Sequence, residues 1–155
     1  MKMVARILSL VLLVPALMYA GAEEETFEFK GTHFTAEYFG CDLACIADTD
    51  TLICVMNEAV KESGATILNT IYHIFPNGSG LTMLTMLAES HASIHTYPEH
   101  RSCFIDLFTC GNRCSHEKFD AILREYLKPG KVYSSVTIRP YPFVEEDLLD
   151  QDSSL

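Results

Sequence analysis

The chain has 155 residues, the length of a single domain. Its apolar fraction of 48% is sufficient for an ordinary hydrophobic core, which excludes intrinsic disorder for most of the chain. Acidic residues outnumber basic ones by 21 to 11, and part of this excess lies in an acidic tail over 141–155 that we expect to be solvated. Because the sequence has no basic patch interleaved with aromatic residues, we expect no nucleic-acid partner.

The first 22 residues differ in composition from the rest of the chain. Lys2 and Arg6 form a basic start, Ile7 to Ala20 is apolar, and small residues occupy 20–22. This order is typical of a secretory signal peptide, and the apolar run contains a proline and is short for a membrane-spanning helix. We therefore expect a secreted or periplasmic protein with its domain over 23–140. Two alternatives stay open: an uncleaved anchor, which would be the chain's only contact with a membrane, and a leader without function on a cytoplasmic protein.

The first half of the domain predicts a strand and a helix. Apolar and polar residues alternate from Thr26 to Gly40, as in a half-buried strand. Asp48 to Thr51 supplies N-cap residues for a helix that continues to Glu62, and Gly64 is its stop signal. Apolar residues recur along one face of this helix, so we expect that face to pack against a sheet.

The second half predicts further strands and a second helix. Ala65 to Phe75 and Leu81 to Ala88 are strand-like and flank a turn, which favours a hairpin. Arg101 to Cys110 alternates again, His116 to Leu127 is helical, and Lys131 to Arg139 is a final strand. The order of strand, helix, two or three strands, helix and strand predicts an α+β two-layer sandwich, in which both helices cover one face of a mainly antiparallel sheet.

The residues that carry chemistry lie in two motifs, Leu87-Ala-Glu-Ser-His-Ala-Ser-Ile-His-Thr-Tyr-Pro-Glu99 and Asp106-Leu-Phe-Thr-Cys-Gly111. Together they place a histidine five residues after Ser90 and a thiol a further 15 residues along the chain. This spacing resembles the S-adenosylmethionine decarboxylases of the short prokaryotic type. The similarity extends from Gly31 to Val136, about two thirds of the chain, and the two motifs in combination are highly specific.

The resemblance implies that the protein makes its own cofactor by cutting its backbone. In this family the matching serine, here Ser90, becomes a pyruvoyl group, which places the cut between Glu89 and Ser90. The serine hydroxyl attacks the preceding carbonyl, the resulting ester loses the serine α-proton, and hydrolysis of the product releases ammonia. His95 matches the histidine that transfers protons during processing, and Thr82 matches a hydroxyl residue that assists.

The resemblance also implies the chemistry of the mature enzyme. The pyruvoyl ketone would form a Schiff base with the amine of S-adenosylmethionine and accept the electrons released with carbon dioxide. Cys110 matches the proton donor, Phe75 and Tyr97 match aromatic substrate contacts, and Glu99 matches a carboxylate that pairs with ribose hydroxyls. The product would be the aminopropyl donor for spermidine synthesis, and cleaved protomers would form a homodimer.

Departures from the family pattern keep other functions open. Tyr97 stands where a tryptophan is more usual, and His100–Phe104 replaces a segment that usually reads Tyr-Gly-Tyr-Ala-Ala. Because an exported enzyme would seldom meet S-adenosylmethionine, a pyruvoyl-dependent decarboxylase of arginine or ornithine is one alternative. A secreted, non-catalytic binding protein that keeps the fold is the other. We expect no metal, since His91 and His95 lie four residues apart in a strand-like segment rather than on a helix, where that spacing binds zinc.

Six cysteines have competing implications. Export would place them in an oxidising compartment, where an even number often indicates disulfides, whereas catalysis requires Cys110 as a free thiol. The alternative is that all six are small buried apolar side chains. One arrangement that satisfies both implications is that Cys110 stays reduced while two of the others pair, from the set Cys41, Cys45, Cys54, Cys103 and Cys114.

Overall fold

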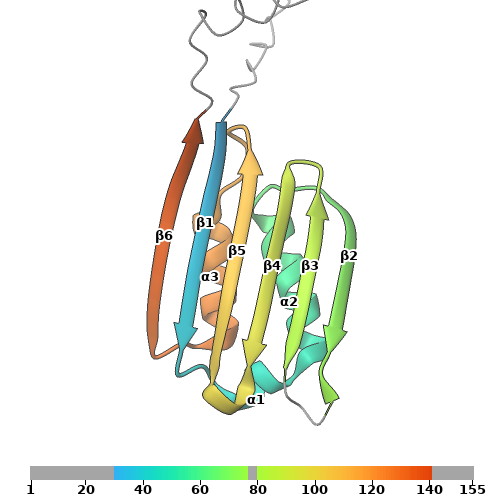
Figure 1. Cartoon of the computed structure of the whole chain (residues 1–155), viewed down its shortest axis with the longest axis vertical. Coiled ribbons are helices and arrows are strands. Elements are labelled where there is room, and N and C mark those ends of the chain that lie inside the picture. Colours follow the sequence, from blue (N-terminus) through green and yellow to red (C-terminus); the bar gives the residue numbers. More distant parts are fainter. Residues whose placement is uncertain (1–29, 77–79, 141–155) are drawn as a thin grey trace, which may run out of the picture.

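The computed structural model describes residues 30–76 and 80–140. Within these ranges, six antiparallel strands form one sheet in the order β2-β3-β4-β5-β1-β6 (Figure 1). The strands are β1 (Lys30–Phe39), β2 (Ile67–Ile74), β3 (Leu81–Leu87), β4 (Ser90–Tyr97), β5 (Ser102–Cys110) and β6 (Lys131–Pro140). The helices are α1 (Leu43–Ala47), α2 (Thr49–Glu62) and α3 (His116–Leu127), and a 3-10 turn, η2 (Pro98–His100), joins β4 to β5.

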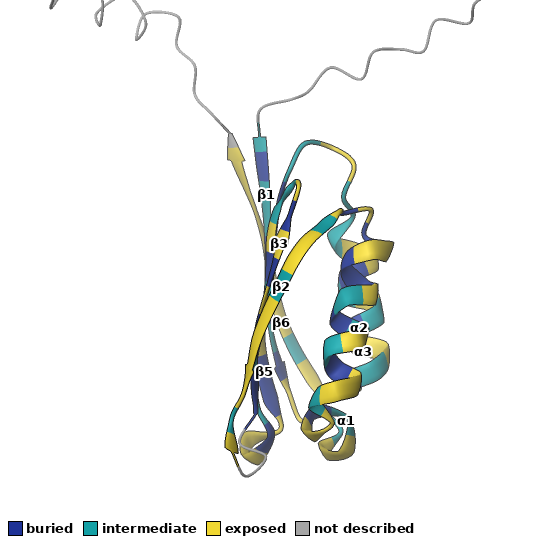
Figure 2. Ribbon diagram, turned by 90° about the vertical axis from the view of Figure 1, so that its right-hand side faces the viewer, coloured by how far each residue is buried: buried dark blue, intermediate teal, exposed yellow. Residues whose placement is uncertain are grey.

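This architecture confirms the expected α+β two-layer sandwich, with the α-helices on one face of the sheet (Figure 2). Both long helices begin with side-chain caps. Asp48, one of the expected N-cap residues, accepts from the Thr51 amide at 3.1 Å, and Ser115 accepts from the Lys118 amide at 3.2 Å. The hairpin of β2 and β3 is confirmed as well. The leader, the first four residues of the expected first strand, the centre of the hairpin turn and the acidic tail lie outside the described residues.

Two elements were not assigned a range from the sequence. β4 occupies the strand-like segment of the first motif, where serine and histidine at the outward positions hide the buried alternation of Ala92, Ile94 and Thr96. α1 is five residues long, too short to show a helical period. It is set by Asp42, whose carboxylate accepts hydrogen bonds from two amides of its first turn.

The core fills the space between the sheet and the helices. Alternate residues of the strands are buried on the helical side, as the two-residue period of a strand requires, and pack with the apolar faces of α2 and α3. Each large apolar side chain buried in this way stabilises the fold by roughly 1.5–3 kcal/mol. The largest of these fully buried apolar residues are Phe119, Ile46, Leu52, Met56, Leu81, Met83, Ile94, Ile105, Leu107, Leu123 and Leu127.

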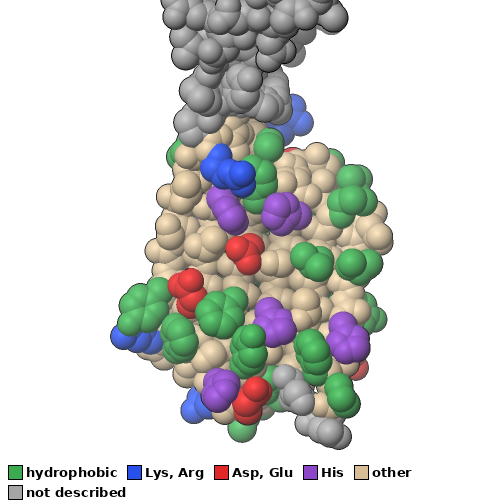
Figure 3. All heavy atoms as spheres, in the orientation of Figure 1, with side chains coloured by type: hydrophobic (Ala, Val, Ile, Leu, Met, Phe, Trp, Pro, Cys, Tyr) green, Lys and Arg blue, Asp and Glu red, His purple; other side chains and the backbone are tan. Residues whose placement is uncertain are grey.

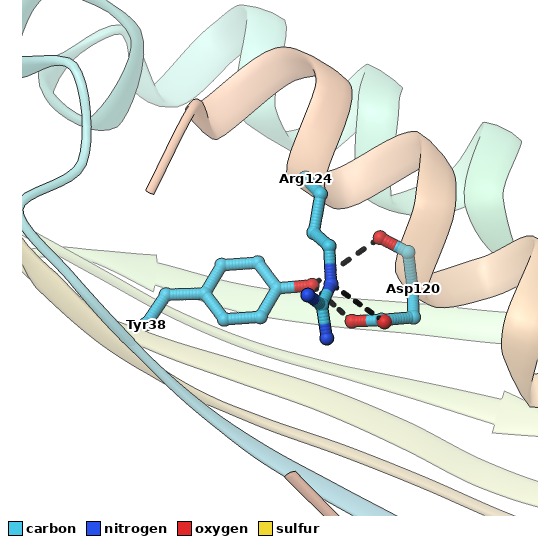
Figure 4. Close-up of polar contacts among 3 residues, drawn as sticks. All are labelled: Tyr38, Asp120 and Arg124. Carbon is cyan, nitrogen blue, oxygen red and sulfur yellow. Dashed lines mark hydrogen bonds and ion pairs between the residues drawn. The ribbon is translucent and has the colours of Figure 1, made fainter. Parts of the chain in front are cut away.

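A polar cluster crosses this core and joins β1 to α3 (Figure 4). Tyr38 is fully buried, and its hydroxyl donates a hydrogen bond to the Asp120 carboxylate. The Nε of Arg124, one turn along α3, donates to the same carboxylate at 2.7 Å. Burial and the neighbouring Asp120 carboxylate raise the pKa of Tyr38 well above its ordinary value, so the phenol stays protonated and acts as the donor.

The opposite face of the sheet, which we call the open face, is covered by none of the described elements (Figure 3). Exposed apolar side chains lie on it, among them Ile71, Leu84, Met86 and Phe104, together with histidines from β1, β2 and β4. A bare apolar patch of this kind is typical of a surface that binds another molecule. The candidate residues of β4 and β5 lie on or beside this face.

Candidate active site

Ser90 is the first residue of β4, and its backbone has an uncommon conformation. Its φ angle is 155°, in a region that residues other than glycine rarely adopt. A conformation of this kind costs on the order of 1–3 kcal/mol and persists only where the surroundings hold it. The strain therefore lies beside the peptide that joins Glu89 to Ser90, the bond that the sequence motif singles out.

Glu89 is fixed through both its backbone and its side chain. The Cys110 amide donates a hydrogen bond to the Glu89 carbonyl oxygen at 3.0 Å. The Glu89 carboxylate accepts a second one from the Thr66 amide at 2.8 Å. The Cys110 amide is thus a donor aimed at an oxygen that would become negatively charged if the carbonyl were attacked.

His91 lies next to the Ser90 hydroxyl. Ser90 Oγ and His91 Nδ1 are 3.1 Å apart, which is within hydrogen-bonding distance. An imidazole in this position is suited to accept the serine proton. The sequence pattern suggested His91 only as a metal ligand, and its adjacency to Ser90 is the one signal that could have indicated this contact.

Cys110 ends β5 with its side chain half-buried on the open face. The burial pattern of this strand alternates, so that Ile105 and Leu107 face the core while Asp106 and Cys110 face the other way. The structure therefore brings Cys110 beside the Glu89–Ser90 bond, as the resemblance implies. We call Glu89, Ser90, His91 and Cys110 the Ser90 cluster.

Asp106 organises a polar group in the middle of the open face that was not singled out from the sequence. Its carboxylate accepts a hydrogen bond from Ser93 Oγ at 3.0 Å. The other carboxylate oxygen lies 3.5 Å from His33 Nε2 of β1. Asp106 opens the second motif, but only the pairing of β4, β5 and β1 places these three residues together.

Thr82 and His95, which the resemblance assigns to processing, face one another across the β3–β4 ladder. Thr82 Oγ1 and His95 Nδ1 are hydrogen-bonded. The centroid of the His95 ring lies 4.6 Å from that of Tyr97 and 5.9 Å from that of Phe75. We call Phe75, Thr82, His95 and Tyr97 the His95 cluster, and Glu99 lies just beyond it in η2 with its side chain exposed.

The two clusters lie toward opposite ends of the sheet. Ser90 and His95 are five residues apart on β4, and a strand rises about 3.3 Å per residue, so roughly 16 Å separates them. Within one chain His95 and Thr82 therefore do not reach Ser90. The imidazole that the Ser90 hydroxyl contacts is that of His91.

The surface beside the Ser90 cluster is shallow. A hollow of about 220 Å³ lies next to His91 and is lined by Ile71, Leu84 and Met86 among others. Ligand pockets usually measure roughly 300–1,000 Å³, so this hollow of the single chain does not enclose a nucleoside-sized substrate. Within the described ranges, no group of three or more histidine, cysteine, aspartate or glutamate side chains is placed to hold a metal ion.

Comparison with known proteins identifies the family. A sequence model of the S-adenosylmethionine decarboxylase family matches residues 32–140, more than half of the chain. The chain belongs to the S-adenosylmethionine decarboxylase family. The matched range contains both clusters, whereas the leader and the acidic tail lie outside it.

Relatives within the S-adenosylmethionine decarboxylase family agree in sequence and in structure. The S-adenosylmethionine decarboxylase proenzyme of Parasynechococcus marenigrum is 43% identical over 98 residues, which are 63% of this chain and 76% of that protein. The proenzyme of Pyrobaculum aerophilum is 39% identical over 103 residues, which are 66% of this chain and 82% of that protein. The crystal structure of the adenosylmethionine decarboxylase from Aquifex aeolicus covers 74% of this chain and 93% of that one, with a TM-score of 0.67 and 29% identity. The family, the fold class and the decarboxylase assignment expected from the sequence are thereby confirmed.

Proposed function

We propose that this S-adenosylmethionine decarboxylase is made as a proenzyme that cleaves itself between Glu89 and Ser90, and that Ser90 becomes its pyruvoyl group. The observation that carries the proposal is the strained backbone of Ser90 beside a carbonyl held by the Cys110 amide. Similarity to proteins named as proenzymes supports it. A pyruvoyl group supplies a ketone for the substrate amine and an acceptor for the electrons released with carbon dioxide.

Residues of the Ser90 cluster account for the cleavage. The first step joins Ser90 Oγ to the carbonyl carbon of Glu89 and breaks the bond between that carbon and the Ser90 nitrogen. His91 is placed to accept the hydroxyl proton, and the Cys110 amide stabilises the charge on the carbonyl oxygen. Removal of the Ser90 α-proton then expels the Glu89 carboxylate as a new chain end. Hydrolysis of what remains of Ser90 releases ammonia and leaves the ketone.

The thiol of Cys110 is positioned to return a proton after carbon dioxide has left. Its side chain lies half-buried on the open face, and its backbone amide donates a hydrogen bond to the Glu89 carbonyl. A protonated thiol is a competent general acid. The amide and the thiol of Cys110 therefore serve different reactions, the first in processing and the second in turnover.

The complete active site is formed by two chains that pack through their open faces. In a two-fold arrangement a surface meets itself, so the Ser90 cluster at one end of the sheet meets the His95 cluster at the other end of the second copy. This arrangement brings His95 and Thr82 to Ser90, which the separation of roughly 16 Å along β4 prevents within one chain. The exposed apolar side chains of the open face supply the buried contact.

The substrate is S-adenosylmethionine, bound between the two clusters of such a dimer. Phe75 and Tyr97 are half-buried aromatic side chains, suited to an adenine ring and a sulfonium. The exposed carboxylate of Glu99 is suited to ribose hydroxyls. The decarboxylated product retains the aminopropyl group that spermidine synthesis requires.

The leader directs the protein out of the cytoplasm, to the periplasm or the medium. Its basic start, apolar run and small residues over 20–22 support this part of the proposal. Among the described residues no helix is long and apolar enough to cross a bilayer. N-terminal sequencing of protein recovered from each compartment tests export: a mature chain that begins near residue 23 supports it, and full-length protein confined to the cytoplasm contradicts it.

The intact mass of the purified protein under denaturing, reducing conditions tests self-cleavage. We expect two fragments that meet at Glu89 and Ser90, and a C-terminal piece of 66 residues with pyruvoyl in place of serine. A Ser90→Ala variant is expected to stay intact and to lose all decarboxylase activity, because it lacks the attacking hydroxyl. A single uncut wild-type chain, indistinguishable from the Ser90→Ala variant, would overturn the proposal and favour a non-catalytic binding protein.

Release of labelled carbon dioxide identifies the substrate. The cleaved protein is incubated separately with carboxyl-labelled S-adenosylmethionine, arginine and ornithine. We expect labelled carbon dioxide from S-adenosylmethionine. The aromatic side chains of the His95 cluster suit an adenine ring and a sulfonium, and arginine and ornithine have neither. Release from arginine or ornithine alone would contradict the substrate assignment while leaving self-cleavage standing.

A further inference from the structure

Two buried cysteines belong to the hydrophobic core, away from both clusters. Cys103 belongs to β5 and is paired in register with Tyr38 of β1. Cys41 comes directly after β1 and the turn at Gly40. Their exposed fractions are 1% and 0%, so neither thiol is in contact with solvent.

Hydrogen bonds hold the two cysteine-bearing segments together. The Cys41 amide donates to the Arg101 carbonyl at 2.9 Å, and Arg101 Nε donates back to the Cys41 carbonyl at 2.6 Å. Both side chains belong to the same buried core cluster. The Cys103 side chain lowers the pKa of the Cys41 thiol in the folded chain.

We propose that Cys41 and Cys103 form a disulfide, and that this disulfide ties together the two fragments produced by cleavage between Glu89 and Ser90. The first part stands on the burial of both cysteines in one core and on the hydrogen bonds that join their segments, whereas the second rests on the proposed function. Cys41 precedes the cut and Cys103 lies after it, so the bridge joins the N-terminal fragment to the C-terminal one.

The oxidation requires a disulfide donor, either a small-molecule disulfide or an oxidised thiol oxidoreductase. The Cys41 thiolate attacks the donor disulfide and displaces one donor thiol. Cys103 then attacks the mixed disulfide at the Cys41 sulfur, which forms the bond between the two Sγ atoms and displaces the second donor thiol. Two protons and two electrons pass from the cysteines to the donor. Because the folded pair is buried, the exchange takes place as the chain folds.

The bridge leaves the thiol of Cys110 free. Cys103 and Cys110 belong to the same strand but point to opposite faces of the sheet, as the alternating burial of β5 shows. Oxidation on the core side therefore does not consume the proton donor on the open face. A disulfide between Cys41 and Cys103 can therefore form in an oxidising compartment while the Cys110 thiol stays reduced for decarboxylation.

Mass spectrometry of the full chain made in a bacterial host with an oxidising cytoplasm tests the inference. Free thiols are blocked with N-ethylmaleimide in denaturant, and the protein is weighed with and without reductant. Without reductant we expect one species with the combined mass of both fragments, less two hydrogen atoms, and four blocked cysteines. With reductant the two fragments separate. Recovery of Cys41 and Cys103 as blocked thiols would overturn the inference.

Variants distinguish a missing Cys41–Cys103 disulfide from a failure of self-cleavage between Glu89 and Ser90. Cys41→Ala and Cys103→Ala are expected to release the fragments without reductant, whereas Cys54→Ala, at an exposed position of α2, keeps them joined. In the uncut Ser90→Ala chain, peptide mapping is expected to find the peptides of Cys41 and Cys103 linked. An uncut wild-type chain that contains this linked pair would overturn the proposed self-cleavage and the joining of fragments, but not the disulfide. Cut fragments that separate without reductant would overturn the disulfide alone.

Discussion

At the scale of the residue, Cys110 offers two separate groups to the proposed chemistry. Its amide is bonded to the Glu89 carbonyl at 3.0 Å, and that bond does not depend on the side chain. Its thiol lies on the open face, where a substrate would approach. Processing and decarboxylation therefore draw on different atoms of one residue, and a substitution of the side chain separates them.

We expect Cys110→Ser to cleave itself to completion but to lose decarboxylase activity. The amide is unchanged, whereas a hydroxyl is a much weaker acid than a thiol, so the turnover number falls by about 10²- to 10⁴-fold. Intact mass reports the cleavage, and release of labelled carbon dioxide reports the turnover. Cys54→Ser, at an exposed position, is the matched control and keeps wild-type activity. A Cys110→Ser chain that fails to cleave would contradict the division of roles.

His91 provides a second test at this scale, because its ring contacts the Ser90 hydroxyl at 3.1 Å. We expect His91→Ala to slow the appearance of the two fragments by on the order of 10²-fold, since the general base for the acyl shift is lost. Pulse labelling followed by gel electrophoresis measures the rate. His116→Ala, a half-buried histidine of α3 in the helical layer, is the control and is expected to cleave at the wild-type rate. Cleavage of His91→Ala at the wild-type rate would exclude His91 as the base.

At the scale of the element, the helical layer is tied to the sheet by a polar contact as well as by apolar packing. Tyr38 of β1 and Arg124 of α3 both donate to the Asp120 carboxylate (Figure 4). A half-buried carboxylate that loses one donor keeps part of its desolvation cost, so this cluster helps to fix how α3 lies on the sheet. β1 also pairs with β5, which carries Cys110, and the cluster therefore supports the strand next to the candidate site.

We expect Tyr38→Phe to lower the free energy of unfolding by roughly 1–3 kcal/mol at neutral pH, because it removes a donor to a charged acceptor. The raised pKa of Tyr38 means that the unfolded phenol, with its ordinary value of 10.0, ionises first as pH rises. The stability that the raised pKa provides is complete below pH 10.0 and is lost above it, by at most about 1.4 kcal/mol per pH unit.

Urea unfolding at neutral pH and at about pH 11 measures both effects. The difference in unfolding free energy between the wild type and Tyr38→Phe is expected to be smaller at the higher pH. Tyr133→Phe, at an exposed position of β6, serves as the control and leaves the unfolding free energy unchanged at both values. Equal unfolding free energies of the wild type and Tyr38→Phe at neutral pH would show that the hydrogen bond to Asp120 contributes nothing.

At the scale of the whole molecule, the open face separates residues that the proposed processing needs together. The Ser90 cluster and the His95 cluster lie roughly 16 Å apart along β4, which no side chain spans. Two-fold packing of open faces brings each Ser90 cluster against a His95 cluster of the other chain. The same packing would cover the exposed apolar side chains and enclose the shallow hollow beside His91.

Co-production of two inactive chains tests this arrangement. His95→Ala and Ser90→Ala are each expected to remain uncut when produced alone. In a mixed dimer, Ser90 of the His95→Ala chain meets His95 of the Ser90→Ala chain, so one complete site forms. Random pairing predicts that up to about half of the His95→Ala chains are cut. Mass spectrometry distinguishes the two chains. Cleavage of the His95→Ala chain on its own, or no cleavage in the mixture, would contradict a shared site.

The sequence by itself determined the order of most elements and the family, because both depend on short-range patterns. Alternation and helix caps predicted β1, α2, α3 and β6, and the two motifs around Ser90 and Cys110 identified the family. β4 was not predicted because serine and histidine at its outward positions obscure the alternation of its buried residues. α1 was not predicted because it is too short to show a helical period.

Only the tertiary structure decided which of these residues meet. Pairing of β3 with β4 places Thr82 against His95, and the bond from the Cys110 amide fixes the Glu89 carbonyl. The approach of Cys41 to Cys103 depends in the same way on hydrogen bonds between segments about 60 residues apart. Strand register and the choice of sheet face are long-range properties, set by which apolar residues share the core, and no local pattern contains them.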